Sequence, residues 1–424
     1  MDKINRPRGT KDVTPKETGR WRALESIAAS TALDFGFGEI RFPAFEHTEL
    51  FVRGVGETTD VVQKEMYTFN DKGGRSITLR PEGTASAVRA AIENGLINET
   101  AQLKMFYIAP MFRYEAPQSG RLREHHQFGA EIFGAAGAEG DLEIIMLAHT
   151  FLSEVLNGEP DGAPGAPRIT LNINSIGCAD CRAAYREALL NYLRGRDVCR
   201  LCGERMERNP LRALDCKDED CRAAVKHAPL MTDFLCADCS ANFSSIKTGL
   251  SQLGIEYTVN ERMVRGLDYY NGLVFEFIHG GLTVLGGGRY DGLTEQLGGP
   301  ATPACGFGCG LERVLAVCES AGISHGEDAA PWFYIAVADA PDSPAGVTAR
   351  ALTRALRKQF RAERDICGRS LKAQLRHADR LGAKFLIIIG GNEVEKGAVE
   401  IKRMADGEWF ESALDSQKII DICT

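Results

Sequence analysis

The spacing of apolar and polar positions divides the first part of the chain into helices and strands. Apolar residues recur at helical spacing in Glu17–Phe35, at Trp21, Leu24, Ile27, Ala28, Thr31 and Leu33. Similar spacing predicts a helix over Asp141–Leu156. Short apolar or alternating runs predict strands over Gly38–Phe42, Ser76–Leu79, Lys104–Met111, His126–Ile132, Arg168–Ile173, Leu273–Ile278 and Leu282–Leu285.

Two stretches interrupt this pattern. Asn157–Pro167 is rich in glycine and proline and predicts a surface loop. A separate segment begins at Ala329–Pro331, and its order of strand, helix, helix and strand, continued by further strands, is typical of a small α/β domain. Its predicted elements are Trp332–Ala338, Ala345–Arg361, Leu371–Leu381 and Lys384–Ile389.

Length and composition indicate a soluble protein of two or three domains. The chain has 424 residues, of which 44% are apolar and 25% charged. The first twenty residues contain no apolar run typical of a signal sequence, and no apolar stretch is long enough to cross a membrane. We therefore expect a cytoplasmic protein without a membrane partner.

The net charge of the chain and the local charge of one segment point in different directions on a nucleic-acid partner. The net charge of −8 does not favour one, because nucleic-acid binding usually leaves a basic footprint. Residues 350–384, however, contain eleven Lys or Arg against three acidic residues. This segment is either a solvated helical face or a surface for RNA.

The densest group of charged side chains lies in Arg113–Glu131, which reads as two strands joined by a polar loop. Arg113 and Glu115 are expected on one strand face, and Gln127, Gly129 and Glu131 on one face of the returning strand. A guanidinium here suits a phosphate, because it offers a fork of parallel donors. The alternative is an edge hairpin with a solvated charged face.

A glycine-rich run precedes a second arginine. Gly306–Ser320 is expected to form a helix entered from a glycine-rich turn, with Arg313 in the first turns of that helix. Glycine lets the backbone approach a ligand closely, although such a turn is as often structural as functional.

Together these two segments resemble motifs 2 and 3 of class II aminoacyl-tRNA synthetases, in which both arginines bind ATP phosphates. The upstream segment Phe42–Glu46 resembles motif 1, the dimer-forming element with its proline.

Further segments resemble one member of that class, the histidyl-tRNA synthetase family. Leu79–Thr84 resembles its substrate loop, and Val264–Tyr270 and Gly287–Asp291 resemble its two histidine-specific signatures. Arg8–Asp12 and Gly56–Val62 also match the family pattern. The resemblance covers nearly the whole chain.

The resemblance implies an α/β (α+β) fold with three parts. An antiparallel-sheet catalytic domain is expected over residues 1–325, interrupted by a helical, cysteine-rich insertion over 176–255. A small α/β anticodon-binding domain is expected over 330–424. The family also implies a homodimer, an insertion that lies over the tRNA acceptor stem, and phosphate contacts for the basic segment 350–384.

The implied reaction is activation of L-histidine by ATP, with Mg²⁺, followed by transfer to tRNA(His). Arg113 and Arg265 are the expected catalytic residues. The expected histidine-binding residues are Glu82, Gly83, Thr84, Arg113, Gln127, Glu131, Arg265, Tyr269 and Tyr270. The expected ATP-binding residues are Arg113, Glu115, Arg121 and Arg313.

The chemistry of the substrate supports the choice of Glu131. An imidazole carries two ring nitrogens, so a selective pocket needs an acceptor for an N–H, which a buried carboxylate provides. Tyr269 and Tyr270 offer a flat wall and a hydroxyl. His125 and His126 are interpreted as packing residues.

The loop of the hairpin departs from the family pattern. Ala116 and Ser119 stand where relatives carry an arginine and a lysine, in the loop that meets the acceptor end and its extra 5′ guanosine. Gln118 and Arg121 remain, and Gln118 is the candidate contact for the acceptor end.

Eight of the thirteen cysteines form close pairs between Cys178 and Cys239. Their spacing suits one or two tetrahedral Cys₄ zinc sites, with either sequential or nested pairing. The family resemblance implies that catalysis does not require zinc. The alternative is reduced, unligated thiols. The residues are Cys178, Cys181, Cys199, Cys202, Cys216, Cys221, Cys236 and Cys239.

An alternative function comes from a paralogue of this family that lacks aminoacylation and serves as a regulatory subunit of ATP phosphoribosyltransferase. That paralogue typically lacks the tail domain and degrades the signatures around Arg265 and Gly287. Both features are intact in this chain.

Overall fold

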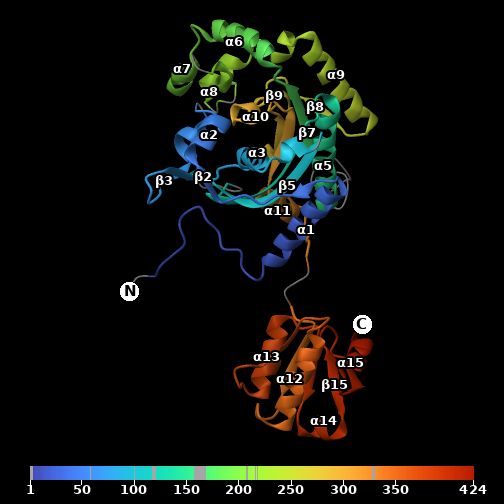
Figure 1. Cartoon of the computed structure of the whole chain (residues 1–424). Coiled ribbons are helices and arrows are strands. Elements are labelled where there is room, and N and C mark those ends of the chain that lie inside the picture. The colour runs from blue at the N-terminus through green and yellow to red at the C-terminus, as the bar shows by residue number, and fades with distance from the viewer. Residues whose placement is uncertain are drawn as a thin grey trace. The chain divides into compact units, whose positions relative to one another are not determined.

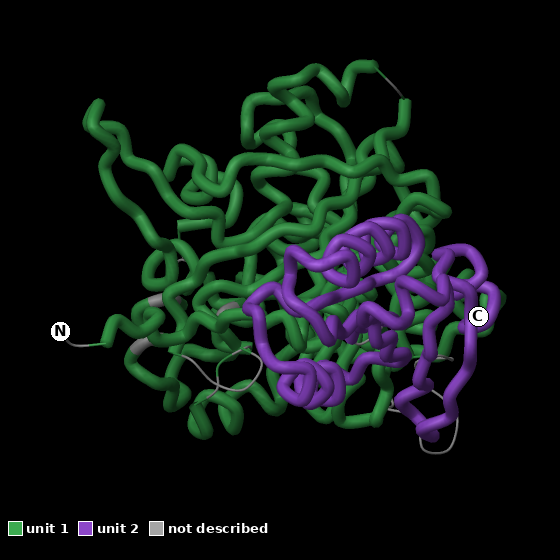
Figure 2. Tube along the Cα trace, turned by 90° about the horizontal axis from the view of Figure 1, so that it is seen from below, with its two compact units in different colours: residues 1–326 green, residues 327–424 purple. Residues whose placement is uncertain are grey.

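The structure, a computed structural model, describes residues 3–57, 59–99, 101–116, 121–156, 169–206, 209–214, 216, 218–326 and 330–424. The chain forms two compact units, residues 1–326 and residues 327–424 (Figure 2). The predicted loop Asn157–Pro167 lies outside the described residues.

The first unit is built on an eight-stranded sheet of order β1-β5-β6-β11-β10-β9-β7-β8. Neighbours from β5 to β7 pair antiparallel, and only the outer pairs β1–β5 and β7–β8 are parallel. This confirms the predicted antiparallel sheet. In sheet order the strands are Gly38–Glu39, Leu103–Phe112, Glu124–Phe133, Ala304–Gly310, Leu282–Arg289, Asn271–His279, Thr170–Ser175 and Tyr257–Val259.

Three helices cover one face of this sheet: α1 (Thr18–Asp34), α5 (Ala138–Leu156) and α11 (Leu311–Ser320) (Figure 1). Their apolar side chains meet Phe128 on β6, whose ring lies 5.0 Å from that of Phe151. Both predicted helices are confirmed, but Leu33 is 59% exposed and does not belong to the apolar face of α1.

Side chains of β5 alternate between the two faces, as the pleat of a strand requires. Phe106 belongs to the core beneath α1 and α5, whereas Met105 and Tyr107 belong to the core on the opposite face. That opposite face is covered by α3 (Thr84–Glu93). Burial on both faces explains why β5 reads as an almost continuous apolar run.

Smaller elements surround α3. A three-stranded sheet joins β2 (Phe45–His47), β4 (Ser76–Leu79) and β3 (Tyr67–Asn70). The neighbouring helices are α2 (Thr48–Val55), the π-helix Val61–Glu65, α4 (Leu96–Glu99) and α10 (Leu293–Gln296).

The cysteine-rich segment between β7 and β8 is helical and forms one end of the first unit (Figure 1). Its α-helices are α6 (Ala179–Leu193), α7 (Arg200–Met206), α8 (Glu219–Val225) and α9 (Ala237–Gln252), with 3₁₀ turns at Pro210–Ala213 and Met231–Phe234. Tyr185 and Leu189 of α6 are buried in a core that continues to β5 and α3.

The second unit is an α/β domain with sheet order β13-β12-β14-β15-β16. Its first three strands are parallel and its last two antiparallel. The strands are β12 (Phe333–Val337), β13 (Ala362–Arg364), β14 (Phe385–Ile389), β15 (Ala398–Arg403) and β16 (Trp409–Ala413). The helices are α12 (Pro344–Leu356), α13 (Leu371–Leu381), α14 (Gly391–Lys396) and α15 (Ser416–Cys423).

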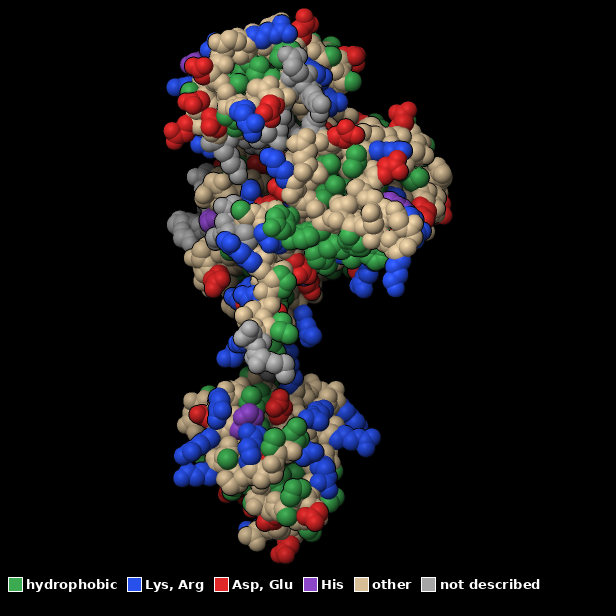
Figure 3. Space-filling model, turned by 90° about the vertical axis from the view of Figure 1, so that its left-hand side faces the viewer, with side chains coloured by type: hydrophobic (Ala, Val, Ile, Leu, Met, Phe, Trp, Pro, Cys, Tyr) green, Lys and Arg blue, Asp and Glu red, His purple; other side chains and the backbone are tan. Residues whose placement is uncertain are grey.

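Basic side chains are prominent on the surface of this second unit in the view of Figure 3. Arg350 and Arg354 on α12 and Lys372, Arg376 and Arg380 on α13 are all exposed. The predicted basic segment is therefore a helical surface rather than buried structure.

Three sequence-based boundaries differ from the structure. The run Gly38–Phe42 pairs only at β1, and the basic helix ends at Leu356, after which β13 forms an additional parallel strand. The predicted glycine-rich turn before Arg313 is wrong, because Ala304–Gly310 is strand β11 at the centre of the sheet. Glycine is required there because a β-carbon at Gly306 would overlap the carboxyl group of Glu131.

In the described part of the chain, none of the helices combines the length and apolar character needed to cross a membrane.

Replacing Gly306 with alanine is expected to destabilise the first unit. The added methyl group would meet the carboxyl of Glu131 and the carbonyl of Ala130, and such overpacking costs about 1–3 kcal/mol. Scanning calorimetry should show a lower unfolding midpoint for the Gly306→Ala variant. Gly292→Ala is the matched control, because a β-carbon there has no described atom within 4 Å. Equal midpoints for the two variants would contradict this account of β11.

Candidate active site

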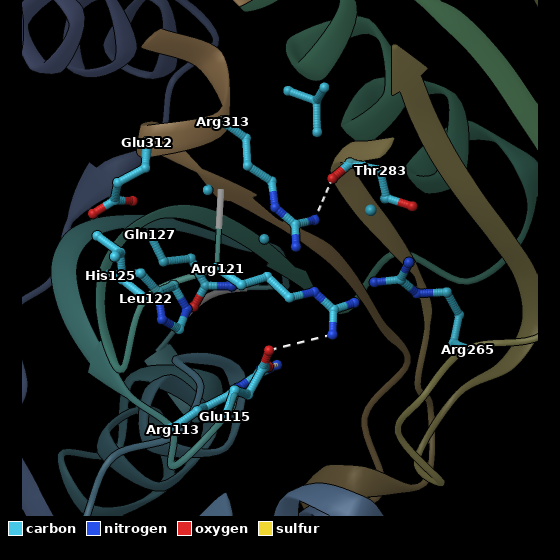
Figure 4. Close-up of a pocket in the computed structure, with 14 residues that line it drawn as sticks. Arg113, Glu115, Arg121, Leu122, His125, Gln127, Arg265, Thr283, Glu312 and Arg313 are labelled. Atoms are coloured by element: carbon cyan, nitrogen blue, oxygen red, sulfur yellow. Dashed lines mark hydrogen bonds and ion pairs between the residues drawn. The ribbon is translucent and has the colours of Figure 1, made fainter. Parts of the chain in front are cut away.

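A pocket of about 150 Å³ opens where the strands β6, β10 and β11 meet the start of α11. Figure 4 shows Arg113, Arg121, Arg265 and Arg313 converging on it from separate segments of the chain. Glu115 and Glu312 are among its acidic lining residues. The structure thus brings together all four predicted ATP-binding residues, Arg113, Glu115, Arg121 and Arg313.

Backbone and carboxylate acceptors orient these guanidinium groups. The Nε of Arg113 donates to the carbonyl of Pro81 at 2.7 Å, and Nη1 of Arg121 lies 3.3 Å from Glu115 Oε2. Arg313 donates through Nη1 to the carbonyl of Thr283. Each guanidinium carries five N–H donors in a fork that matches an anion with several oxygens.

The pKa shifts of Arg313 and His125 reflect both burial and the positive charge of the pocket. Burial lowers the pKa of Arg313, and the neighbouring Arg121 lowers it further. Burial and the cations Arg113 and Arg313 lower the pKa of His125 to about 3, so its imidazole is neutral. A site that disfavours additional positive charge in this way is suited to a polyphosphate.

Arg265 enters the pocket from the loop before β9. It forms an ion pair with Glu276 and lies over the ring of Tyr270, with 5.7 Å from the guanidinium carbon to the ring centroid. Its Nε is buried without a hydrogen-bond partner among the described residues, and so is Oε1 of Gln127, which lines the same pocket. Two buried polar atoms left in this state indicate a place for a polar ligand.

Glu131 lies four residues from Gln127, on the same face of β6, and is completely buried. Its Oε1 accepts hydrogen bonds from the hydroxyls of Thr84 at 2.8 Å and Tyr107 at 3.2 Å. Its Oε2 accepts one from the hydroxyl of Tyr290. Burial nevertheless raises the pKa of this carboxyl group to about 8.

Aromatic rings enclose the carboxyl group. The rings of Tyr269 and Tyr270 lie 4.6 Å apart, and that of Tyr269 lies 5.5 Å from that of Tyr290. Tyr107 fits against Gly83 and Gly129, where any β-carbon would overlap its ring. The result is a small aromatic compartment with one titratable acceptor, which suits a flat polar ring.

Glu82 lies at the N-terminal end of α3 and is also buried. Its two oxygens accept from the backbone N–H groups of Thr84 and Ala85, each at 2.8 Å. Burial raises the pKa of Glu82, while these two hydrogen bonds lower it. Two helix N–H groups thus hold this carboxyl beside Thr84, which itself contacts Glu131.

A buried ion pair fixes strand β10, which directly precedes Tyr290. Arg289 donates through Nε to Asp141 at 3.0 Å and through its terminal nitrogens to the carbonyls of Ala135 and Gly137. Asp141, Ala135 and Gly137 lie on or just before α5, so these bonds fasten β10 to that helix.

Sequence reasoning missed several of these groups. Tyr107 reads as one more apolar residue of a strand, and its only signal is its position opposite Gly129 on the neighbouring strand. His125 was interpreted as a packing residue but lines the pocket, whereas His126 does pack, with its ring 4.8 Å from Trp21. The candidate Gln118 lies outside the described residues.

The eight clustered cysteines gather in the nested arrangement. One group is Cys178, Cys181, Cys236 and Cys239, and the other is Cys199, Cys202, Cys216 and Cys221. Neither group lines the pocket.

Comparisons with known proteins agree with this geometry. A protein-family model described as histidyl-tRNA synthetase matches residues 9–314, which include every residue of the pocket and of the aromatic compartment. The chain belongs to the histidyl-tRNA synthetase family. A second family model, described as an anticodon binding domain, matches residues 336–419.

Individual relatives of the family match over their full length. Histidine–tRNA ligase of Clostridium perfringens (strain SM101) is 49% identical over 422 residues, covering 99% of both chains. Histidine–tRNA ligase of Acetivibrio thermocellus is 49% identical over 417 residues, covering 97% of both. Among solved structures, apo S. aureus histidyl-tRNA synthetase matches with a TM-score of 0.80 and 35% identity, covering 99% of both.

The raised pKa of Glu131 predicts a pH dependence of stability. The pKa rises from 4.5 to about 8 on folding, so the folded protein retains a proton that the unfolded chain has lost at neutral pH. The corresponding stabilisation is fully present below about pH 4.5 and is lost as the pH rises to about 8. Glu131→Gln keeps the shape of the side chain and removes this titration.

The free energy of unfolding of Glu131→Gln, relative to that of the unmodified protein, should therefore increase by at least about 1 kcal/mol from about pH 5 to about pH 8. Urea unfolding without ligands at a series of pH values measures this difference. A difference that is constant over the range would contradict a raised pKa for Glu131.

Proposed function

We propose that this chain is an ATP-dependent ligase that converts L-histidine to histidyl-adenylate and transfers the histidyl group to tRNA(His). Pyrophosphate and AMP are released. The observation that carries the proposal is that one strand, β6, supplies both Gln127 to the arginine-lined pocket and the buried Glu131 to the aromatic compartment. A nucleotide and a polar aromatic amino acid would thus be held side by side.

In the first step, an oxygen of the histidine carboxylate attacks the α-phosphorus of ATP. The new bond is between this oxygen and phosphorus, and the bond from the α-phosphorus to the pyrophosphate oxygen breaks. Such a reaction depends on positioning and charge stabilisation more than on an acid or base. Arg113 and Arg265 would hold the α-phosphate and the carboxylate, and Arg313 would bind the γ end of a bent ATP.

Glu115 and Glu312 line the pocket with the oxygen donors that Mg²⁺ prefers, and this ion would neutralise phosphate charge. Glu115 would bind either the adenine amine or the metal, and Arg121 would contact the nucleotide. Zinc has no part in this chemistry.

Histidine selection rests on the aromatic compartment. Glu131 would accept an imidazole N–H, and Tyr269 and Tyr270 would form the wall and contact the second nitrogen. Glu82, Gly83 and Thr84 would surround the α-amino group, with Gln127 and Arg265 at the carboxylate. A site built to hydrogen-bond its substrate rejects analogues without those groups by factors of about 10⁴–10⁵, so editing is unnecessary.

Transfer of the histidyl group would require the tRNA to contact both units. We assign anticodon contacts to the unit at 330–424, acceptor-stem contacts to the insertion at 176–255, and the acceptor end to the loop with Gln118. The catalytic domain would comprise 1–325. The exposed basic side chains of α12 and α13 support phosphate contacts in the second unit. We place the reaction in the cytoplasm, where its substrates are.

We also propose a homodimer formed through the segment Phe42–Glu46. In this segment the carbonyls of Phe42 and Pro43 accept from Nη1 of Arg80 at 2.7 and 3.1 Å. These bonds fix the segment beside Tyr107, whose ring is 5.1 Å from that of Phe42. A rigid motif 1 would thus lie next to the histidine compartment.

The alternative is a regulatory subunit of ATP phosphoribosyltransferase. The match of residues 336–419 to an anticodon binding domain and the four arginines of the pocket favour the ligase. A purely regulatory chain has no need of either feature.

Aminoacylation tests the proposal directly. The protein, ATP, Mg²⁺ and radiolabelled L-histidine are incubated with a tRNA(His) transcript that carries the extra 5′ guanosine. Histidyl-tRNA(His) should form, and a transcript of unrelated anticodon and acceptor sequence should remain uncharged. Folded protein that charges neither transcript but stimulates ATP phosphoribosyltransferase would replace the ligase with the regulatory alternative.

Arg265→Ala is expected to leave the fold intact and to reduce adenylate formation by at least about 10²-fold, because a donor aimed at developing charge is lost. ATP–pyrophosphate exchange with histidine measures the rate. Arg75→Ala is the control, since Arg75 is 69% exposed and pairs with Asp71 in a hairpin outside the pocket. Near-normal exchange by Arg265→Ala would remove the role assigned to Arg265.

A further inference from the structure

The insertion contains two groups of four cysteines in which sequence-distant pairs meet. In each group all four sulfur atoms lie within 4.8 Å of one another. Cys178 and Cys181 meet Cys236 and Cys239, so the first group joins the start of α6 to the start of α9. The second group joins the start of α7 to the start of α8 through Cys199, Cys202, Cys216 and Cys221.

The sulfur separations fit a shared ion rather than disulfides. The Sγ atoms of Cys178 and Cys181 are 3.5 Å apart, and those of Cys199 and Cys216 are 3.8 Å apart. All thirteen cysteines are free. Four sulfurs at about 2.3 Å from one Zn²⁺ in a tetrahedron are about 3.8 Å from one another, whereas a disulfide needs about 2.05 Å.

In each group a backbone N–H donates to one of the sulfur atoms. The N–H of Cys236 donates to Sγ of Cys181 and the N–H of Cys199 donates to Sγ of Cys221, each at 3.1 Å. Cys178 and Cys236 are the N-cap residues of α6 and α9. Secondary hydrogen bonds of this kind orient and stabilise metal ligands.

The short helices beside the second cysteine group indicate what a bound ion would do. Helices α7 and α8 have seven residues each, and helices so short are not stable by themselves in water. A metal that joins their starts would add a fixed link to the apolar contacts of these helices.

The same segments contact the loop at residues 262–270, which carries Arg265, Tyr269 and Tyr270. Arg182, directly after Cys181, donates through Nη1 to the carbonyl of Tyr270 at 3.1 Å. Asn209, between Cys202 and Cys216, donates through Nδ2 to Oδ1 of Asp268 at 3.0 Å.

We propose that each cysteine group binds one structural Zn²⁺ ion, and that the two ions hold the insertion so that Arg182 and Asn209 brace the loop at 262–270. The zinc sites stand on the cysteines alone. The bracing rests on the proposed histidine-activating function, because it assigns this loop to the amino acid site.

Metal content tests the zinc sites without any assay of activity. The full-length protein, purified without chelator or added metal, should contain two Zn²⁺ per chain by plasma mass spectrometry. A mercurial reagent that blocks thiols should release both ions to a chromogenic chelator. Iron in place of zinc, or protein that contains less than about half an ion per chain, would overturn the assignment.

Paired substitutions separate the two sites. Cys178→Ser with Cys181→Ser should leave one ion per chain, and so should Cys199→Ser with Cys202→Ser. Cys367→Ser is the control and should leave two, because Cys367 lies in the second unit outside both groups. Two ions retained in either double variant would contradict zinc binding by these cysteines, and release from the unmodified protein still decides the stoichiometry if a double variant fails to fold.

Bracing is tested by Asn209→Ala and Arg182→Ala with zinc content measured beside kinetics. Each variant should retain two ions and raise the KM for histidine in ATP–pyrophosphate exchange about five- to tenfold, with the KM for ATP unchanged, as expected for one lost hydrogen bond. Asn191→Ala and Glu187→Ala, both exposed on α6, are the controls. An unchanged histidine KM would refute the bracing and leave the zinc sites. Absence of exchange in the unmodified protein would instead refute the proposed function.

Discussion

The burial of one carboxyl group constrains the arrangement of the catalytic unit. Glu131 is removed from water, and a buried carboxyl without partners is strongly unfavourable. Its three hydroxyl donors come from α3, from β5 and from the residue after β10, so elements far apart in sequence must meet around one pair of oxygens. Glycines at positions 83, 129 and 306 make that approach sterically feasible. The glycine-rich signatures therefore serve the packing of a polar network as much as the backbone contact with a ligand.

Two neighbouring sites of different electrostatic character follow from this arrangement. Burial raises the pKa of the Glu131 carboxyl, so a ligand that offers an N–H to this group would change its protonation. Around Arg113 and Arg313, burial and the positive charge of these two side chains lower the pKa of His125, and the same positive charge suits phosphate oxygens. Gln127 and Arg265 lie between the proposed phosphate and amino acid sites. Each has a buried polar atom that lacks a hydrogen-bond partner among the described residues. A reaction between an amino acid carboxylate and a nucleotide phosphate needs polar side chains where the two sites meet.

Sequence reasoning found what is local or encoded in motifs and missed what depends on tertiary packing. The helix α1 and the strand β4 follow from periodicity, and Glu131 follows from the hairpin and the chemistry of imidazole. The strand β11 does not follow from the sequence, because glycine has low strand propensity and the facing side chains of Glu131 and Gln127 are what require Gly306 and Gly308. The pair Arg289–Asp141 joins residues 148 positions apart, a distance at which no local pattern signals contact. Cysteine spacing alone could not separate sequential from nested pairing for the same reason.

The central claim is that the chain activates histidine and no other amino acid. ATP–pyrophosphate exchange, run separately with each of the twenty amino acids and purified protein, tests it most directly. The account predicts exchange with histidine alone, because only an imidazole satisfies Glu131 within a compartment of this aromatic character. Exchange with several amino acids would contradict the role of Glu131 in selection. No exchange with any of them, from folded protein, would contradict the enzymatic function itself.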